Sequence, residues 1–136
     1  MRIQEGDGWR LVVDPARSPF PVLIGGNGWA TELTLAEAAL LRRGVMSLVE
    51  QHGDLMGGLM AEEALTLEFE AALATDPTGP GGELWLELEG NRQQWSLRFV
   101  LTPGPHRRAV EGSWAAAASR SLAAVLQQQG DLADPP

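Results

Sequence analysis

The chain has 136 residues, of which 44% are hydrophobic and 21% charged, as expected for one soluble globular domain. Its ten basic residues, all arginine, face eighteen acidic residues, and the net charge of −8 disfavours nucleic acids and anionic membranes as partners. The absence of cysteine excludes disulfides, thiolate nucleophiles and cysteine metal sites, and no apolar run is long enough for a signal peptide or a membrane span. We therefore expect a cytoplasmic protein, with one domain over residues 1–130 and a disordered tail over residues 131–136.

The first part of the chain predicts two short strands and a helix. "GWRLVVDP" (residues 8–15) indicates a strand of about five residues, and the apolar run 22–24 predicts a short buried strand ahead of several glycines. Thr34 and Glu37 form a capping box, in which each side chain accepts a hydrogen bond from a backbone amide of the other. The apolar residues that follow recur at helical spacing, and Gly53 is the expected stop.

Period-two alternation then predicts three strands. Residues 65–73 alternate apolar and polar side chains, which is typical of a half-buried strand. "GGELWLELEGNRQQWSLRFVLTPG" (residues 81–104) predicts a hairpin with a four-residue loop at 91–94, because a shift by one residue would place leucines opposite polar residues. The expected pairs are Leu88 with Leu97, Leu86 with Phe99, Leu84 with Leu101, Glu87 with Arg98 and Trp85 with Val100.

The last element is a helix expected from about Trp114 to Gln129, with Ser113 as its N-cap and Gly130 as its stop. The order is then β-β-α-β-β-β-α, an α+β fold in which an antiparallel sheet is covered by two helices on one face. No internal repeat is visible in the sequence. Most of the five tryptophans, which lie beside glycines or near the ends of elements, are expected to fill the core.

The outer face of the predicted sheet is unusually acidic. It collects Glu68, Glu70, Glu83, Glu87 and Glu89, together with Trp85 and Arg98. One interpretation is a solvated face whose charges prevent aggregation. A second is a docking surface in which a tryptophan is the anchor inside an acidic rim. A third is a pair of glutamates two residues apart that holds Mg²⁺ or Ca²⁺, although such a pair would share an ion only loosely.

The leading functional hypothesis is a non-enzymatic binding module that acts by protein–protein contact. Its expected interface residues are Trp85, Glu87, Glu89 and Arg98, and its expected partner is a basic protein, with a homodimer also compatible. We assign no cofactor, no metal site and no catalytic residue. A carboxylate- or metal-dependent enzyme stays open as an alternative, with Glu68, Glu70 or His106 as the groups to test.

A second alternative is a regulator that binds single-stranded nucleic acid. Arg92, Arg98, Arg107 and Arg108 would contact the phosphates, and the "PHRR" segment that contains His106 could receive an anion at a helix N-terminus. The competing interpretation is that these arginines pair with nearby acids such as Glu111. The other histidine, His52, lies on the apolar side of the first helix, where a structural role is expected.

A set of segments in fixed order carries a family resemblance. "GWRL", "PVLIGGNGWATELT", "LMAEE", "LWLELEG", "WSLRFVL" and "RRAVEGSW" extend from Gly8 to Trp114. Together they resemble a small cyanobacterial family known as a domain of unknown function. This family shares the Gly-Trp-Arg opening, the Trp-Ala-x-Glu-Leu-Thr approach to the first helix and the Glu-Gly-x-Trp approach to the last. The loop over residues 75–82 is longer than the family pattern.

The resemblance implies a fold similar to that of the Whirly-like single-stranded-DNA-binding transcriptional regulators. An antiparallel sheet with a packed helix, and dimers built through helices, would follow from it. It does not imply DNA binding, because one fold can host unrelated functions. The family has no assigned activity, so the resemblance transfers no functional residue to this chain.

Overall fold

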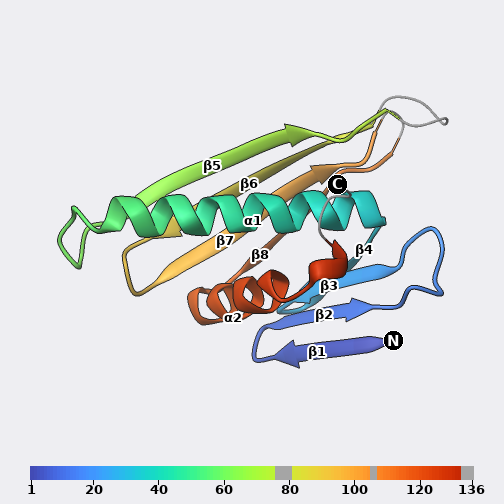
Figure 1. The fold of residues 1–136 in the computed structure, drawn as a ribbon, viewed down its shortest axis with the longest axis horizontal. Helices are drawn as coiled ribbons and strands as arrows, with labels where there is room; N and C mark the ends of the chain where they lie inside the picture. Colours follow the sequence, from blue (N-terminus) through green and yellow to red (C-terminus); the bar gives the residue numbers. More distant parts are fainter. Residues whose placement is uncertain (76–80, 105–106, 133–136) are drawn as a thin grey trace.

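Two four-stranded units, each followed by a helix, make up the fold (Figure 1). The computed structural model describes residues 1–75, 81–104 and 107–132. The first unit contains β1 (Arg2–Gly6), β2 (Trp9–Val13), β3 (Val22–Gly26), β4 (Trp29–Leu33) and α1 (Leu35–Met56). The second contains β5 (Leu65–Ala72), β6 (Glu83–Gly90), β7 (Trp95–Thr102), β8 (Val110–Trp114) and α2 (Ala116–Gln127), followed by the short 3₁₀ helix η1 (Gly130–Leu132). The fold is α+β, and the order of four strands and a helix occurs twice, although no repeat is visible in the sequence.

Each unit forms its own antiparallel sheet, with the strands in chain order: β1 to β4 make sheet A, and β5 to β8 make sheet B. The expected single sheet is therefore two sheets, and the expected order β-β-α-β-β-β-α lacked β1, β4 and β8. β1 is an edge strand that is exposed along most of its length, so its sequence shows no alternation of apolar and polar residues. β4 carries only Trp29 and Leu33 as large apolar residues.

Two of the three hairpins of sheet A, β1–β2 and β3–β4, turn through an Asx-Gly dipeptide, Asp7-Gly8 and Asn27-Gly28. The two glycines have φ of 79° and 80°, which two-residue turns of this kind require and which glycine adopts without strain. Such dipeptides are the strongest local signal of a hairpin, so the sequence did carry evidence for β1 and β4.

A tryptophan follows each of these turns and lies opposite a glycine across the hairpin. The pairs are Gly6 with Trp9 and Gly26 with Trp29. A Cβ atom on either glycine would overlap the indole Nε1 of its partner. Glycine is therefore needed at these two positions to leave room for the ring.

α1 begins with the predicted capping box but ends later than predicted. The Thr34 hydroxyl accepts from the Glu37 amide at 3.1 Å, and the Glu37 carboxylate accepts from the Thr34 amide at 2.8 Å. Gly53 does not stop the helix, which continues to Met56 and is capped by Gly57. The buried Met56 side chain explains the extension, because one further turn places it in the apolar interior.

Neither helix has a basic residue in its last turn. Carbonyl groups at the C-terminal ends of both helices instead accept hydrogen bonds from arginines elsewhere in the chain. Arg92 donates to the carbonyl of Met56, the last residue of α1, at 2.7 Å and to that of Leu59 just beyond it at 2.8 Å. Arg42 donates to the carbonyls of Leu126 and Gln127 at 2.8 and 2.9 Å, at the end of α2. A guanidinium suits this role because its planar donors can reach two acceptors at once.

Two glycines of α1 differ in their surroundings and give a matched pair of variants. A Cβ on Gly44 would overlap Leu86 Cδ1 and lie 2.7 Å from Phe69 Cδ1, whereas a Cβ on Gly53 would meet nothing within 4 Å. Replacing glycine by alanine in a helix gains about 1 kcal/mol, but crowding a packed core costs about 1–3 kcal/mol. We therefore expect Gly44→Ala to lower the free energy of unfolding and Gly53→Ala to raise it by about 0.5–1 kcal/mol.

Urea denaturation followed by circular dichroism measures both changes. Stabilisation by Gly44→Ala comparable to that by Gly53→Ala would show that α1 does not pack against sheet B as closely as the structure has it.

The register predicted for the β6–β7 hairpin is confirmed, including the loop at residues 91–94. β5 pairs with the other side of β6, and its alternating pattern is also as predicted. A third glycine–tryptophan pair, Gly90 with Trp95, closes this hairpin. Period-two alternation is reliable here because one side of the sheet is buried and the other is open to solvent.

The approach to α2 differs from the prediction. Trp114 is the last residue of β8 rather than part of the helix, and the N-cap is Ala115, which makes no side-chain hydrogen bond. The buried Ser119 hydroxyl instead connects the start of α2 to the sheet: it accepts from the Leu97 amide and donates to the Trp114 carbonyl, both at 2.9 Å. Ser113 therefore does not cap the helix, and the hydrogen bonds of Ser119 attach the start of α2 to the sheet.

Both helices pack against the inner side of sheet B. α1 lies along β5 and β6, and α2 lies against β7 and also reaches β1 and β2 of sheet A (Figure 1). The opposite side of sheet B is not covered by either helix. Within the described residues, no helix combines the length and hydrophobicity that crossing a bilayer requires.

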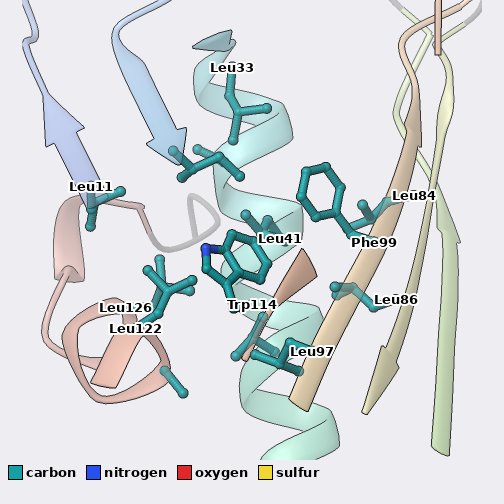
Figure 2. Close-up of a cluster of buried hydrophobic side chains, with 14 of the residues drawn as sticks. Leu11, Leu33, Leu41, Leu84, Leu86, Leu97, Phe99, Trp114, Leu122 and Leu126 are labelled. Atoms are coloured by element: carbon teal, nitrogen blue, oxygen red, sulfur yellow. The ribbon is translucent and has the colours of Figure 1, made fainter. Parts of the chain in front are cut away.

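Trp114 occupies the centre of the apolar core. Figure 2 shows its ring between Leu122 and Leu126 of α2 on one side and Leu86 and Leu97 of sheet B on the other. Each of these side chains is at most 2% exposed. The expectation that most tryptophans fill the core is met in full by two of the five, Trp114 and Trp95, which is 7% exposed. Trp9 and Trp29 are partly buried and pack against the core.

An aromatic cluster joins the two sheets. Trp29, Phe99 and Trp114 have ring centroids 5.2–5.7 Å apart. Two indole hydrogen bonds cross between the sheets: Trp114 Nε1 donates to the Gly25 carbonyl at 2.9 Å, and Trp29 Nε1 donates to the Ser113 carbonyl at 3.2 Å. Each unit thus supplies a tryptophan whose indole is satisfied by the backbone of the other.

The segment expected to be a disordered tail is ordered at its beginning. Asp131 and Leu132 belong to η1, and the side chain of Leu132 is 1% exposed. Arg2 of the edge strand β1 forms an ion pair with Asp131, and Gln129 donates to Gln4 at 2.9 Å. The expected disorder is therefore wrong for Asp131 and Leu132, because burial of the leucine holds these residues against the body of the domain. Residues 133–136 lie outside the described residues.

Candidate functional site

The side of sheet B that faces away from the helices is the candidate site, and we call it the outer face. Its residues are Thr66, Glu68, Glu70 and Ala72 of β5; Glu83, Trp85, Glu87 and Glu89 of β6; Ser96, Arg98, Val100 and Thr102 of β7; and Glu111 and Ser113 of β8. Every glutamate predicted for this surface lies on it. The alternating leucines and Phe99 point to the core instead, so the period of two separates the two sides of the sheet.

Two of the glutamates are directly opposed across neighbouring strands. Glu68 of β5 pairs with Glu87 of β6, and Glu70 lies opposite Trp85 in the next outward-facing position. Side chains directly opposite each other on antiparallel strands are about 4.5–5.5 Å apart at Cβ, so like charges there destabilise the sheet. Repulsion between Glu68 and Glu87 therefore destabilises the sheet at this position.

Trp85, Glu87 and Arg98 form a small cluster within this face. The Arg98 guanidinium carbon lies 5.0 Å from the centroid of the Trp85 ring, and its Nη2 lies 3.4 Å from Glu87 Oε1. Exposed contacts of these two kinds contribute about 1 kcal/mol or less each. Arg98 therefore contacts two of the other residues expected at the interface, Trp85 and Glu87, and Glu89 lies next along β6 on the same face.

A pocket of about 240 Å³ lies at the border between this face and sheet A. Its walls are Trp29, Arg98, Glu111, Gly112 and Ser113. Trp29 and Glu111 were not among the site residues predicted from the sequence. No local sequence pattern could have identified Trp29 as a site residue, because it reaches this pocket from β4 of the other sheet. Glu111 was named only as a partner for nearby arginines.

The carboxylates do not gather into a metal site. Within the ranges 1–75, 81–104 and 107–132, no three or more histidine, aspartate or glutamate side chains lie close enough to hold an ion. Glu68 and Glu70 point outward from an exposed edge strand. The hypothesis of a carboxylate- or metal-dependent enzyme gains no support from this arrangement.

The arginines of the nucleic-acid hypothesis do not line one groove. Arg92 lies in the β6–β7 turn and caps α1, whereas Arg107 and Arg108 precede β8 beyond the opposite end of β7. Eight residues of strand separate these two ends, about 26 Å at 3.3 Å per residue. Arg98 lies between them, held by Glu87 and Trp85. His106 lies outside the described residues.

His52 is buried, as expected for a histidine on the apolar side of α1. Its side chain is 3% exposed, and Nε2 donates to the Gly90 carbonyl at 3.0 Å. Its ring packs against Trp95 with the centroids 6.2 Å apart. His52 thus ties α1 to the β6–β7 hairpin.

Comparison with known proteins places the chain among uncharacterised relatives. The family model described as the domain of unknown function DUF1818 matches residues 4–129. A crystal structure of a protein with unknown function from the DUF155 family of Prochlorococcus sp. NATL2A is similar, with a TM-score of 0.80 and 32% sequence identity. The similarity covers 93% of this chain and 97% of that one. No curated protein matches the chain.

These matches confirm the likeness to an uncharacterised family with a cyanobacterial member. They give no link to the Whirly-like regulators, so that part of the expectation is not supported by them. The family match spans nearly the whole chain, including both four-stranded units and both α helices. The protein therefore belongs to the DUF1818 family.

Proposed function

We propose that this protein is a non-enzymatic binding module that takes a basic segment of another protein on its outer face. The observation that carries the proposal is the direct opposition of Glu68 and Glu87, two like charges on neighbouring strands. A cationic partner would relieve this repulsion. The electrostatic free energy that destabilises the free sheet would then favour binding. Arg98 offsets only part of it, because Glu87 accepts its single ion pair.

The remaining charges of the face favour the same partner. Glu70, Glu83, Glu89 and Glu111 have no ion pair within the described part of the chain. An acidic surface of this kind raises the rate of encounter with basic partners and excludes acidic ones. The net charge of −8 adds to this steering.

Trp85 is the proposed anchor. Its half-buried ring lies in the middle of the face, opposite Val100 on one side and Glu70 on the other. Tryptophan and arginine are the residues that most often dominate the free energy of binding at protein interfaces, particularly near the centre. The neighbouring pocket beside Trp29 and Glu111 can accept one side chain of the partner.

We place this activity in the cytoplasm of a cyanobacterium, on the basis of the cysteine-free sequence and the Prochlorococcus relative. A homodimer is compatible with it provided that the outer face stays free. The alternative, a Whirly-like regulator that binds single-stranded nucleic acid, is less well supported. It needs a continuous basic groove, whereas the arginines are separated and the sheet between them is acidic.

Photo-crosslinking followed by calorimetry tests the proposal. With p-benzoylphenylalanine in place of Ser96 on the outer face, the protein is expected to cross-link a basic protein from a cyanobacterial lysate. Calorimetry with that purified partner then gives the dissociation constant. We expect Trp85→Ala to weaken binding about 30-fold, equivalent to about 2 kcal/mol. The double change Glu68→Arg and Glu89→Arg should weaken it at least about tenfold.

The matched control is the double change Glu62→Arg and Glu63→Arg. These residues are exposed in the connection between α1 and β5, and their replacement alters the net charge equally. Binding should persist in this control. Equal loss in both double variants would mean that only overall charge matters. Cross-linking from Ala124 on α2 but not from Ser96 would place the partner on the wrong side of the molecule.

A further inference from the structure

Arg92 and Arg120 donate to backbone carbonyls rather than to carboxylates. Arg2, Arg10, Arg17 and Arg98 each form an ion pair with an aspartate or glutamate. Arg92 uses Nη2 to bond backbone carbonyls, and Arg120 uses Nη1 to donate to the Gln93 carbonyl at 3.0 Å. Within the described residues neither makes an ion pair, and each has further N–H donors to spare.

These two arginines line the same pocket, on the side of the molecule where α1 and α2 lie. The pocket has a volume of about 410 Å³, and its lining includes Val49, His52, Met56, Arg92, Trp95 and Arg120, with Gly53 and Gly57 at α1. Among the residues that the structure describes, no aspartate or glutamate lines this pocket. In a chain with eighteen acidic residues, two unneutralised guanidinium groups beside one hollow make a locally positive site.

The pocket continues into a second hollow between the helices. This neighbour has a volume of about 420 Å³ and shares Val49, Trp95 and Arg120 with the first. Met46 and Ala123 extend its apolar surface, and Glu50 and Gln127 add one carboxylate and one amide. One end of the combined groove, at Arg92 and Arg120, is therefore cationic. The rest is largely apolar apart from Glu50 and Gln127, a division that suits a ligand with an anionic group on a flat hydrophobic body.

We propose that this groove binds a small organic anion, a carboxylate or a phosphate, through Arg92 and Arg120, with its apolar body against Trp95 and Val49. Guanidinium groups match the geometry of both anions and can donate two hydrogen bonds to one group. The C-terminus of α1 carries about half a negative charge nearby, which is less than the charge of the two arginines. Aromatic and aliphatic surfaces then hold the body of the ligand.

Nuclear magnetic resonance with three matched probes tests this site. The probes are 2-naphthoate, 2-naphthyl phosphate and the neutral 2-naphthalenemethanol, which share one ring system and differ in charge. At least one anion is expected to bind saturably and to shift the indole N–H resonance of Trp95, while the indole of Trp85 on the outer face stays unchanged. The alcohol should bind at least about tenfold more weakly, because it cannot form charge-assisted hydrogen bonds. Comparing the two anions distinguishes a carboxylate site from a phosphate site.

Two variants assign the binding to the groove. Arg120→Gln removes one charge and a single exposed hydrogen bond, so the fold should persist while anion binding falls at least about tenfold. Gly53→Leu places a side chain in open space at the mouth of the pocket and should block binding. The control Arg10→Gln removes the same charge from the exposed ion pair with Glu5 and should leave binding unchanged.

The proposal is overturned if neither anion binds at millimolar concentration or if the alcohol binds as well as the anions. It is equally overturned if Arg120→Gln has no more effect than Arg10→Gln, or if the resonance of Trp95 does not move. Because this groove and the outer face lie on opposite sides of sheet B, failure here leaves the proposed protein-binding function untouched.

Discussion

Trp114→Ala is expected to bring the protein close to unfolding in water. Removing a buried tryptophan side chain typically costs about 3–5 kcal/mol, because the apolar contacts are lost and a cavity remains. The Gly25 carbonyl would also lose its donor inside the core, which adds about 1–3 kcal/mol. The sum is comparable to the 5–15 kcal/mol by which domains of this kind are stable. Urea denaturation followed by far-ultraviolet circular dichroism measures the loss without relying on tryptophan fluorescence.

Trp85→Ala is the matched control, since it makes the same chemical change on the outer face. Trp85 is only half-buried, and its described ring contact is the stacked Arg98. We expect its replacement to lower the free energy of unfolding by about 1 kcal/mol or less. Similar losses in the two variants would contradict the placement of Trp114 at the centre of the core. The small effect expected for Trp85 is also what makes this variant usable in the binding experiment.

Gly90→Ala should be almost as damaging, for a reason that involves no apolar burial. Gly90 ends β6 with φ of 152°, a conformation that residues with a side chain rarely adopt. An added Cβ would overlap the Gln94 carbonyl and the Trp95 Cα, and would lie 2.7 Å from the Trp95 Cβ. Backbone strain and overpacking each cost about 1–3 kcal/mol, so we expect a loss of about 3–5 kcal/mol in urea denaturation.

Gly28→Ala separates these two causes. Gly28 also has a positive φ, 80°, but an added Cβ there would meet nothing within 4 Å. Strain alone should then cost about 1–2 kcal/mol. If Gly90→Ala cost no more than Gly28→Ala, the tight closure of the β6–β7 hairpin around Trp95 would be wrong. The His52 bond to the Gly90 carbonyl would then also need another explanation.

The organisation of the molecule explains why these positions are sensitive. Each unit has an open sheet that cannot bury its apolar side alone, so the two units share one core. Trp29 and Trp114 cross between the sheets, and Arg42 and Arg92 tie each helix end to a neighbouring element. These contacts hold one side of sheet B against the helices and leave the other side for recognition.

Strong local patterns in the sequence predicted several elements correctly. Alternation over residues 65–73 and 83–102 yielded three strands, the register of the β6–β7 hairpin and the acidic outer face. The Thr34–Glu37 capping box marked the start of α1. These predictions succeed because a half-buried strand and a capped helix start are decided by residues within a few positions of one another.

Elements with weak local patterns were missed or misplaced. β1 is a polar edge strand, and β8 ends at Trp114, which looked like the start of a helix because alanines follow it. Gly53 looked like a stop, yet α1 continues until Met56 reaches the core. β8 and the end of α1 depend on burial against other elements, which overrides local propensity, whereas β1 depends on its pairing with β2.

The sequence by itself determined the chemical character of the protein: an acidic, cysteine-free α+β chain whose glutamates alternate with leucines along two strands. Only the tertiary structure decided that the strands form two sheets, that Trp29 crosses to the border of the outer face, and that Arg92 and Arg120 meet beside Trp95. The physical reason is distance along the chain. Periodicity and capping act over a few residues, whereas the aromatic cluster and the arginine pocket bring together side chains that no local pattern relates.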